Sequence, residues 1–130
     1  VYPGVVEMVQ AVRAAGCRTG LVTSKNRVGA FRGLRLAGLE DAMDVVIGAD
    51  DVTNPKPHRE PVDLAVARLG ADPSATVYVG DSVHDMHSGR SAGVRTAAVL
   101  WGPFGRPDLE PADPDHWLHH PHELLTLLDT

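Results

Sequence analysis

The segment Thr76–Asp85 joins an apolar run to a glycine and two carboxylates, and this join limits the possible folds more than any other part of the chain. Residues Thr76–Val79 have no polar alternation, and Gly80 and Asp81 follow them directly. Such a run is typical of a strand buried on both faces of a parallel sheet. Ligands of these sheets collect at the carboxyl ends of the strands, so Asp81 is expected at that edge.

The spacing of the two aspartates predicts a cation site. If a helix begins after Ser82, Asp85 lies in its first turn and can point back toward Asp81. Two hard oxygen ligands favour Mg²⁺ over softer metals. The alternative is that Asp81 is a turn residue and Asp85 an ordinary acid at a helix start.

The composition predicts one globular domain over residues 1–130, because 43% hydrophobic and 22% charged content is near the average. A net charge of −5 argues against nucleic-acid and anionic-membrane surfaces, so the expected partner is a small molecule. No apolar run approaches the roughly 18 residues that span a bilayer, and no secretory pattern opens the chain. A cytoplasmic location is therefore expected, and the oligomeric state stays open.

Helix and strand signals alternate along the chain with short connections, which favours an α/β fold with a parallel sheet. The expected helices cover about 3–15, 26–37, 62–69, 85–92 and 123–128, and the expected strands cover 18–22, 44–48, 76–79 and 96–100. A loop is expected to lead from Trp101 to the last helix.

Further polar residues follow the strands at positions that suit phosphate. Thr23 and Ser24 close the first strand, where a hydroxyl and backbone N–H groups can hold a phosphoryl oxygen. Helix capping explains them equally well. Lys56 stands between Pro55 and Pro57, and an ammonium in a stiff loop can neutralise a transferring phosphoryl group. The alternative is a plain surface lysine.

Three features follow one another along the chain: the hydroxyl after the first strand, a Lys-Pro-x-x-Glu-Pro segment and a Gly-Asp-Ser-x-x-Asp segment. With these features in this order, the chain resembles the haloacid dehalogenase (HAD) superfamily. Within it, the chain is similar to the phosphoglycolate phosphatase and pyrophosphatase PpaX-like branch. The segments that carry the resemblance are Tyr2–Gly4, Leu21–Lys25, Val45–Gly48, Lys56–Val62 and Ser88–Gly93. Arg59 departs from the proline usual in the lysine segment, which concerns loop stiffness more than chemistry.

The resemblance implies a HAD-like, Rossmann-like three-layer α/β/α fold around a parallel sheet. It also implies transfer of a phosphoryl group through an aspartyl-phosphate, on small phosphorylated metabolites. Thr23 and the backbone of Ser24 would then bind the phosphoryl group, and Lys56 would stabilise it. Asn54 would line the entrance.

The cofactor that the resemblance implies is Mg²⁺, which shields the phosphoryl charge. Asp81 would be its ligand, and Asp85 would act through a metal-bound water. Ser82 would steady the same loop.

The family's nucleophile and its acid–base partner belong to an Asp-x-Asp-Gly motif at the end of the first strand, ahead of an inserted helical cap. No Asp-x-Asp precedes Thr23 here, so we expect residues 1–130 to be the part of the core domain that follows the cap. Asp113 and Asp115 have the spacing, but their proline-flanked segment favours a loop role. Without the nucleophile, the chain alone is expected to be inactive.

The absent first strand also matters for the sheet, because in the family it lies between the strands that end here at Val22 and Val79. Its absence leaves a space of roughly 9.6 Å between those strands, with unpaired backbone groups on both sides. Either the chain belongs to a longer protein, or the two halves close and pair directly. We expect the first.

Two other classes of protein stay open. One is a noncatalytic, truncated HAD-like module that retains weak phosphate and Mg²⁺ binding. The other is a receiver-type signalling domain, but such domains place the acidic cluster first and the lysine last, the reverse of the order here. The choice between phosphoglycolate and pyrophosphate depends largely on the cap and is not predicted.

Several aromatic residues and histidines are expected to have ordinary roles. His84 and His87 are expected to be exposed or to lie outside the metal's immediate ligands, because the nearby oxygens suit Mg²⁺ better. Trp101 and Phe104 either border the mouth of the site or cover the sheet edge.

Overall fold

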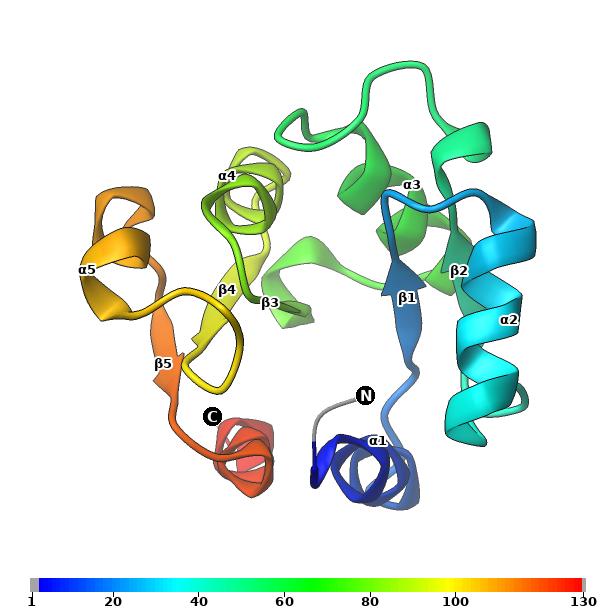
Figure 1. Cartoon of the computed structure of the whole chain (residues 1–130), viewed down its shortest axis with the longest axis horizontal. Coiled ribbons are helices and arrows are strands. Elements are labelled where there is room, and N and C mark those ends of the chain that lie inside the picture. Colours follow the sequence, from blue (N-terminus) through cyan, green and yellow to red (C-terminus); the bar gives the residue numbers. More distant parts are fainter. Residues whose placement is uncertain (1–2, 130) are drawn as a thin grey trace.

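A computed structural model describes residues 3–129, so Tyr2 of the resemblance lies outside the described residues (Figure 1). The α-helices are α1 (Val5–Ala14), α2 (Arg27–Ala37), α3 (Glu60–Leu69), α4 (Val83–Ser91) and α5 (Arg106–Leu109). The strands are β1 (Gly20–Val22), β2 (Val45–Ile47), β3 (Val77–Gly80), β4 (Arg95–Val99) and β5 (His116–Leu118). Short 3₁₀ helices are η1 (Ala49–Asp51), η2 (Pro73–Ala75), η3 (Glu110–Ala112) and η4 (Pro121–Asp129). None of the described helices has the length and apolarity needed to cross a membrane.

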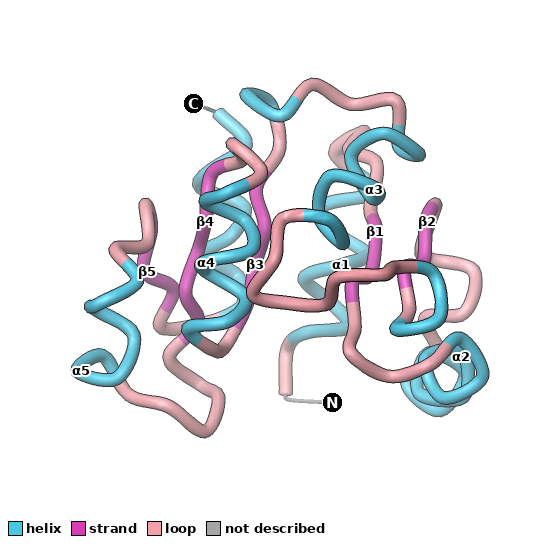
Figure 2. Tube along the Cα trace, turned by 90° about the horizontal axis from the view of Figure 1, so that it is seen from above, coloured by secondary structure: helices cyan, strands magenta, loops and turns pink. Residues whose placement is uncertain are grey.

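The strands form two parallel sheets rather than one. β1 pairs with β2, while β3, β4 and β5 form a second sheet in that order. β1 and β3 are the inner strands, and they lie next to each other without a ladder between them (Figures 1 and 2). The two halves therefore do not pair directly, and the width of the space expected between β1 and β3 stays a prediction.

Helices cover both faces of the sheets, which confirms the expected α/β/α layers. Successive residues of a strand point to opposite faces, and β4 shows this clearly. Ala97 and Val99 pack in a core with α1, α2 and η4, whereas Ala98 packs with Met86 of α4 and Leu109 of α5. α3 packs against α4, and its residues Val62 and Val66 form a third apolar cluster with Ala92 and Val94, just after α4, and with Tyr78 of β3.

Apolar packing joins the two sheets in the absence of a shared ladder. α1 packs along η4, so an element beside the first sheet contacts an element beside the second (Figure 1). The same core contains Val46 of β2 and Leu118 of β5. The buried members of this core are Met8, Val9, Val12, Ala30, Leu34, Leu39, Val46, Ala97, Val99, Leu118 and Leu124.

Two sequence predictions about strands were wrong. Residues 116–118 were expected in a loop, yet they form β5, with Ala97 opposite His116. The sequence His-Trp-Leu has no strand-like alternation, and the open edge of β4 supplies the pairing. β3 was expected to be buried on both faces, but each of its residues is only partly buried. The reason is its place at a sheet edge beside the vacant position.

The loop predicted after Trp101 and the predicted last helix also differ from the structure. Within the segment after Trp101, residues 106–112 form two short helical turns. The last helix is a 3₁₀ helix that begins at Pro121. The other predicted helices and strands are present, with ends shifted by up to about two residues, as is usual for assignments at helix ends.

Candidate active site

A buried ion pair is the centre of the site. Lys56 Nζ lies 2.7 Å from Asp85 Oδ1, and the two side chains are only 14% and 11% exposed. The pair joins the loop that precedes α3 to the first turn of α4. Charge-assisted hydrogen bonds of this length are stronger than neutral ones, so the contact holds both side chains in place.

The Asp85 carboxylate receives further donors on both oxygens. The Tyr78 hydroxyl donates to Oδ1 at 3.2 Å, and the Asp81 backbone N–H donates to Oδ2 at 3.1 Å. The Asp85 N–H in turn donates to Ser82 Oγ, the N-cap of α4. Asp85 therefore faces the protein, with less free capacity for a metal than the spacing alone suggested.

Two glycines make room for the aspartates. A Cβ on Gly80 would lie 2.5 Å from the Asp85 Cβ, closer than real Cβ atoms approach. A Cβ on Gly102 would lie 3.0 Å from the Asp81 Cβ. The loop after β4 therefore lies against Asp81. In the same loop, Trp101 packs against the main apolar core and Phe104 is exposed.

The two carboxylates have opposite pKa shifts. Burial by itself raises the pKa of Asp85, but the Lys56 ammonium and the hydrogen bonds lower it below its usual value overall. For Asp81, burial and then the negative charge of Asp85 raise the pKa. Burial and the Asp85 charge also raise the pKa of Tyr78, which keeps its hydroxyl protonated as a donor.

Thr23 and Ser24 lie beside Lys56 at a small hollow of about 10 Å³, room for about one water. The N-cap of α2 is Asn26, whose Oδ1 accepts from the Gly29 N–H. Thr23 Oγ1 accepts the local N–H of Lys25 at 3.2 Å. Capping of the helix therefore does not account for Thr23 and Ser24.

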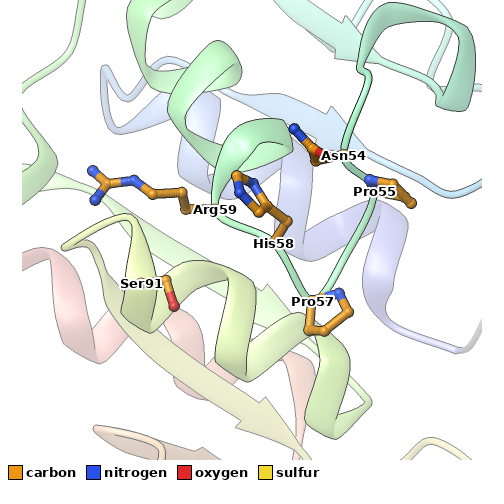
Figure 3. Close-up of a pocket in the computed structure, with 6 residues that line it drawn as sticks. All are labelled: Asn54, Pro55, Pro57, His58, Arg59 and Ser91. Carbon is orange, nitrogen blue, oxygen red and sulfur yellow. The ribbon is translucent and has the colours of Figure 1, made fainter.

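The structure thus brings Thr23, Ser24, Lys56, Asp81 and Asp85 together at the carboxyl ends of β1 and β3. Asn54 is different. It lines an open pocket of about 530 Å³ with Pro57, His58, Arg59 and others, on the α4 side of the loop (Figure 3). Its role at the entrance stays a prediction.

The model of the family described as "Haloacid dehalogenase-like hydrolase" matches residues 1–99. This chain belongs to that family. It is 41% identical over 127 residues to the pyrophosphatase PpaX of Bacillus pumilus, covering 98% of this chain and 59% of the relative. It is 42% identical over 124 residues to PpaX of Bacillus velezensis, covering 95% and 57%. The chain thus spans less than two thirds of these curated relatives.

Solved HAD structures share the fold. A HAD phosphatase from Thermococcus onnurineus is 32% identical, with a TM-score of 0.84 over 98% of this chain and 58% of that one. A protein from Haemophilus somnus 129pt, described as a predicted phosphoglycolate phosphatase, is 25% identical, with a TM-score of 0.89 over 97% and 56%.

Sequence reasoning missed two residues that hold the HAD site. The Glu60 carboxylate accepts two backbone N–H groups. The Thr53 N–H donates to Oε2 at 2.9 Å, and the Asn54 N–H donates to Oε1 at 3.2 Å. The position of Glu60 in the Lys-Pro-x-x-Glu-Pro segment could have indicated this role. Tyr78, the donor to Asp85, was read only as part of an apolar strand, and nothing local marked its hydroxyl.

Side chains that suit other metals do not gather at the site. His84 and His87 are exposed on α4. Among residues 3–129, no three His, Cys, Asp or Glu side chains meet as a complete metal centre. Asp115, which has the Asp-x-Asp spacing, accepts the Thr96 N–H at 2.8 Å and so ties β5 to β4.

Proposed function

We propose that this chain is the lysine-bearing and magnesium-binding part of a phosphatase for small phosphorylated metabolites. The reaction passes through an aspartyl-phosphate whose nucleophile lies outside the chain. The observation that carries the proposal is the buried 2.7 Å pair of Lys56 and Asp85 beside Thr23 and Ser24. A lysine used only for solubility would be exposed, whereas this one is fixed toward a shared edge of two sheets.

The phosphoryl group would be held by groups of different kinds. The Thr23 hydroxyl and the Ser24 N–H donate to its oxygens, and the Lys56 ammonium neutralises charge that grows on them during transfer. Donors that are already oriented lower a barrier more than mobile ones, because they need no reorganisation during the reaction. Asp85 supplies that orientation by holding Lys56.

Asp81 is the residue that fits a magnesium ion. Its carboxylate takes part in no ion pair among the described residues. Burial and then the negative charge of Asp85 raise its pKa, and the positive charge of Lys56 opposes this shift only in part. A hard cation would relieve both. Asp85 would contact a water of the ion through Oδ2, the oxygen that accepts the Asp81 N–H. When bound, Mg²⁺ supplies charge neutralisation to the phosphoryl oxygens.

The substrate class rests on the relatives and on the charge of the chain. PpaX proteins are pyrophosphatases by name, and one structural neighbour is described as a predicted phosphoglycolate phosphatase. A net charge of −5 favours a small anion held at a local cation over a polyanion bound across a surface. We assign no nucleic-acid or membrane partner and place the protein in the cytoplasm.

A chimera tests the chemistry. The Asp-x-Asp-Gly strand and cap of a PpaX relative are placed before residue 1, and phosphate release from pyrophosphate and phosphoglycolate is measured with Mg²⁺. We expect turnover from the chimera and none from the 130-residue chain. Lys56→Ala and Asp81→Asn are each expected to lower kcat/KM roughly 100-fold or more.

The control is Arg35→Ala, which removes an exposed positive charge from α2 and is expected to leave kcat/KM unchanged. Full activity in the Lys56→Ala chimera would contradict the proposal. Turnover by the 130-residue chain that Asp81→Asn abolishes would contradict the external nucleophile. An inactive chimera that still binds phosphate would favour the noncatalytic module.

A further inference from the structure

Ser88 is a buried hydroxyl inside α4 that no part of the proposed chemistry uses. Its residue is 0% exposed, and its Oγ donates to the backbone carbonyl of His58 at 2.6 Å. A buried helical position is ordinarily filled by an apolar side chain, because a buried hydroxyl costs free energy unless it is hydrogen-bonded. This hydroxyl instead reaches a residue 30 positions earlier in the chain.

The partner of Ser88 belongs to the loop that carries Lys56. At the start of this loop, Glu60 receives the N–H groups of Thr53 and Asn54. Within it, the His58 N–H donates to the Pro55 carbonyl at 3.0 Å and closes a tight turn around Lys56. The Ser88 bond attaches the end of that turn to α4, so the loop is held on both sides of the lysine.

α4 presents Asp85 and Ser88 to the loop as one unit. Residues three apart lie on the same face of a helix, so Asp85 meets Lys56 while Ser88 meets His58. The helix itself is closely packed on the sheet. A Cβ on Gly89 would lie 2.9 Å from the Thr96 Cγ2, so α4 has no room to shift toward β4.

We propose that Ser88 is a positioning residue for Lys56: its hydroxyl fixes the position of loop 53–59 along α4, so that the ammonium meets Asp85. The role of Ser88 in the ion pair does not depend on the proposed function, whereas an effect of Ser88 on phosphate binding rests on it. Without the bond, the His58 carbonyl turns toward water, the turn loosens, and Lys56 spends less time on Asp85.

The direct test measures the Lys56–Asp85 hydrogen bond by NMR, through the scalar coupling between Lys56 Nζ and the Asp85 carboxyl carbon. Ser88→Ala is expected to reduce this coupling by half or more. The matched control is Ser91→Ala, the same change at an exposed position of α4, which is expected to keep it. Ser88→Cys retains a weak donor and is expected to give an intermediate value. A coupling in Ser88→Ala equal to that of the parent chain overturns the proposal.

The second measurement separates this inference from the proposed function. Inorganic phosphate is titrated into each variant, and its Kd is read from the Ser24 amide shift. Ser88→Ala is expected to weaken binding about fivefold, the usual effect of one lost neutral hydrogen bond. Ser91→Ala is expected to match the parent. If the parent chain binds no phosphate, the proposed function is contradicted, while the coupling still decides the role of Ser88.

Discussion

Gly80 shows at the scale of one residue how the site depends on the absence of a side chain. The residue ends β3, and the Asp85 side chain lies directly against its Cα. Its backbone is not in the left-handed region, so its conformation does not require glycine. The requirement is space, since any Cβ would push Asp85 away from Lys56.

Gly80→Ala is therefore expected to destabilise the chain by about 1–3 kcal/mol, the usual cost of forcing an atom into a packed region. Urea unfolding followed by circular dichroism measures the change. Gly33→Ala is the matched control, because a Cβ there meets nothing within 4 Å. Alanine in that helix is expected to raise stability by about 0.5–1 kcal/mol. Equal stability of the Gly80→Ala chain and the parent would refute the steric argument.

Asp51, the last residue of η1 after β2, connects several elements. Its Oδ2 accepts the Gly48 N–H at 2.8 Å and the Arg27 guanidinium of α2 at 3.0 Å. Arg68 of α3 lies 3.9 Å from Oδ1. The hydrogen bond from Gly48 lowers the pKa of Asp51 most, burial opposes it, and the Arg27 contact lowers it further.

This shift predicts a pH-dependent stability. The folded pKa lies below the ordinary value of 3.8, so the carboxylate stabilises the fold above pH 3.8 and loses that effect as the pH falls below it. Asp51→Asn is expected to cost about 1–3 kcal/mol at neutral pH. Urea unfolding across pH should show this difference shrinking in acid. Asp41→Asn, at an exposed position, serves as the control. A difference that stayed constant down to strongly acidic pH would rule out the charge as its source.

At the scale of elements, β5 is a strand that the local sequence pattern does not predict. Its sequence His-Trp-Leu follows Pro114 and Asp115 and has no alternation of apolar and polar residues. It becomes a strand because the edge of β4 offers unpaired backbone groups, and Asp115 fixes the register through Thr96. Longer, periodic segments such as α2 and α3 were predictable, since their own residues carry the signal.

At the scale of the whole molecule, one apolar core replaces the ladder that would join the sheets. Leu118 of β5 is 2% exposed in this core, across from residues of α1 and β2. Leu118→Ala is expected to destabilise the chain by about 2–5 kcal/mol, as is usual for buried leucine. Leu36→Ala is the matched control, because Leu36 is 84% exposed on α2.

Urea unfolding of both variants measures the difference, with circular dichroism for the helices and the fluorescence of Trp101 and Trp117, which lie in or next to the second sheet. If the core joins the halves, both signals change together in the parent chain. Two separate transitions in the parent, with only one of them shifted by Leu118→Ala, would show that the halves unfold independently.

By itself, the sequence determined the order of most helices and strands and the polar residues at the strand ends. Apolar runs, glycine stops and the Lys-Pro-x-x-Glu-Pro and Gly-Asp-Ser-x-x-Asp segments are local, so neighbouring residues suffice to read them. They predicted Thr23, Lys56 and Asp81 at one edge. In the structure, Thr23 and Lys56 line the same hollow, and Asp81 is linked to Lys56 through Asp85.

Only the tertiary structure decided which partner each polar group takes. Asp85 was expected beside a metal, yet it is held first by Lys56, 29 residues away, and by Tyr78. The bond from Ser88 to His58 and the pairing of β5 are likewise contacts between distant segments. A hydroxyl, carboxylate or strand edge has several possible partners of similar energy, and burial next to one of them makes the choice.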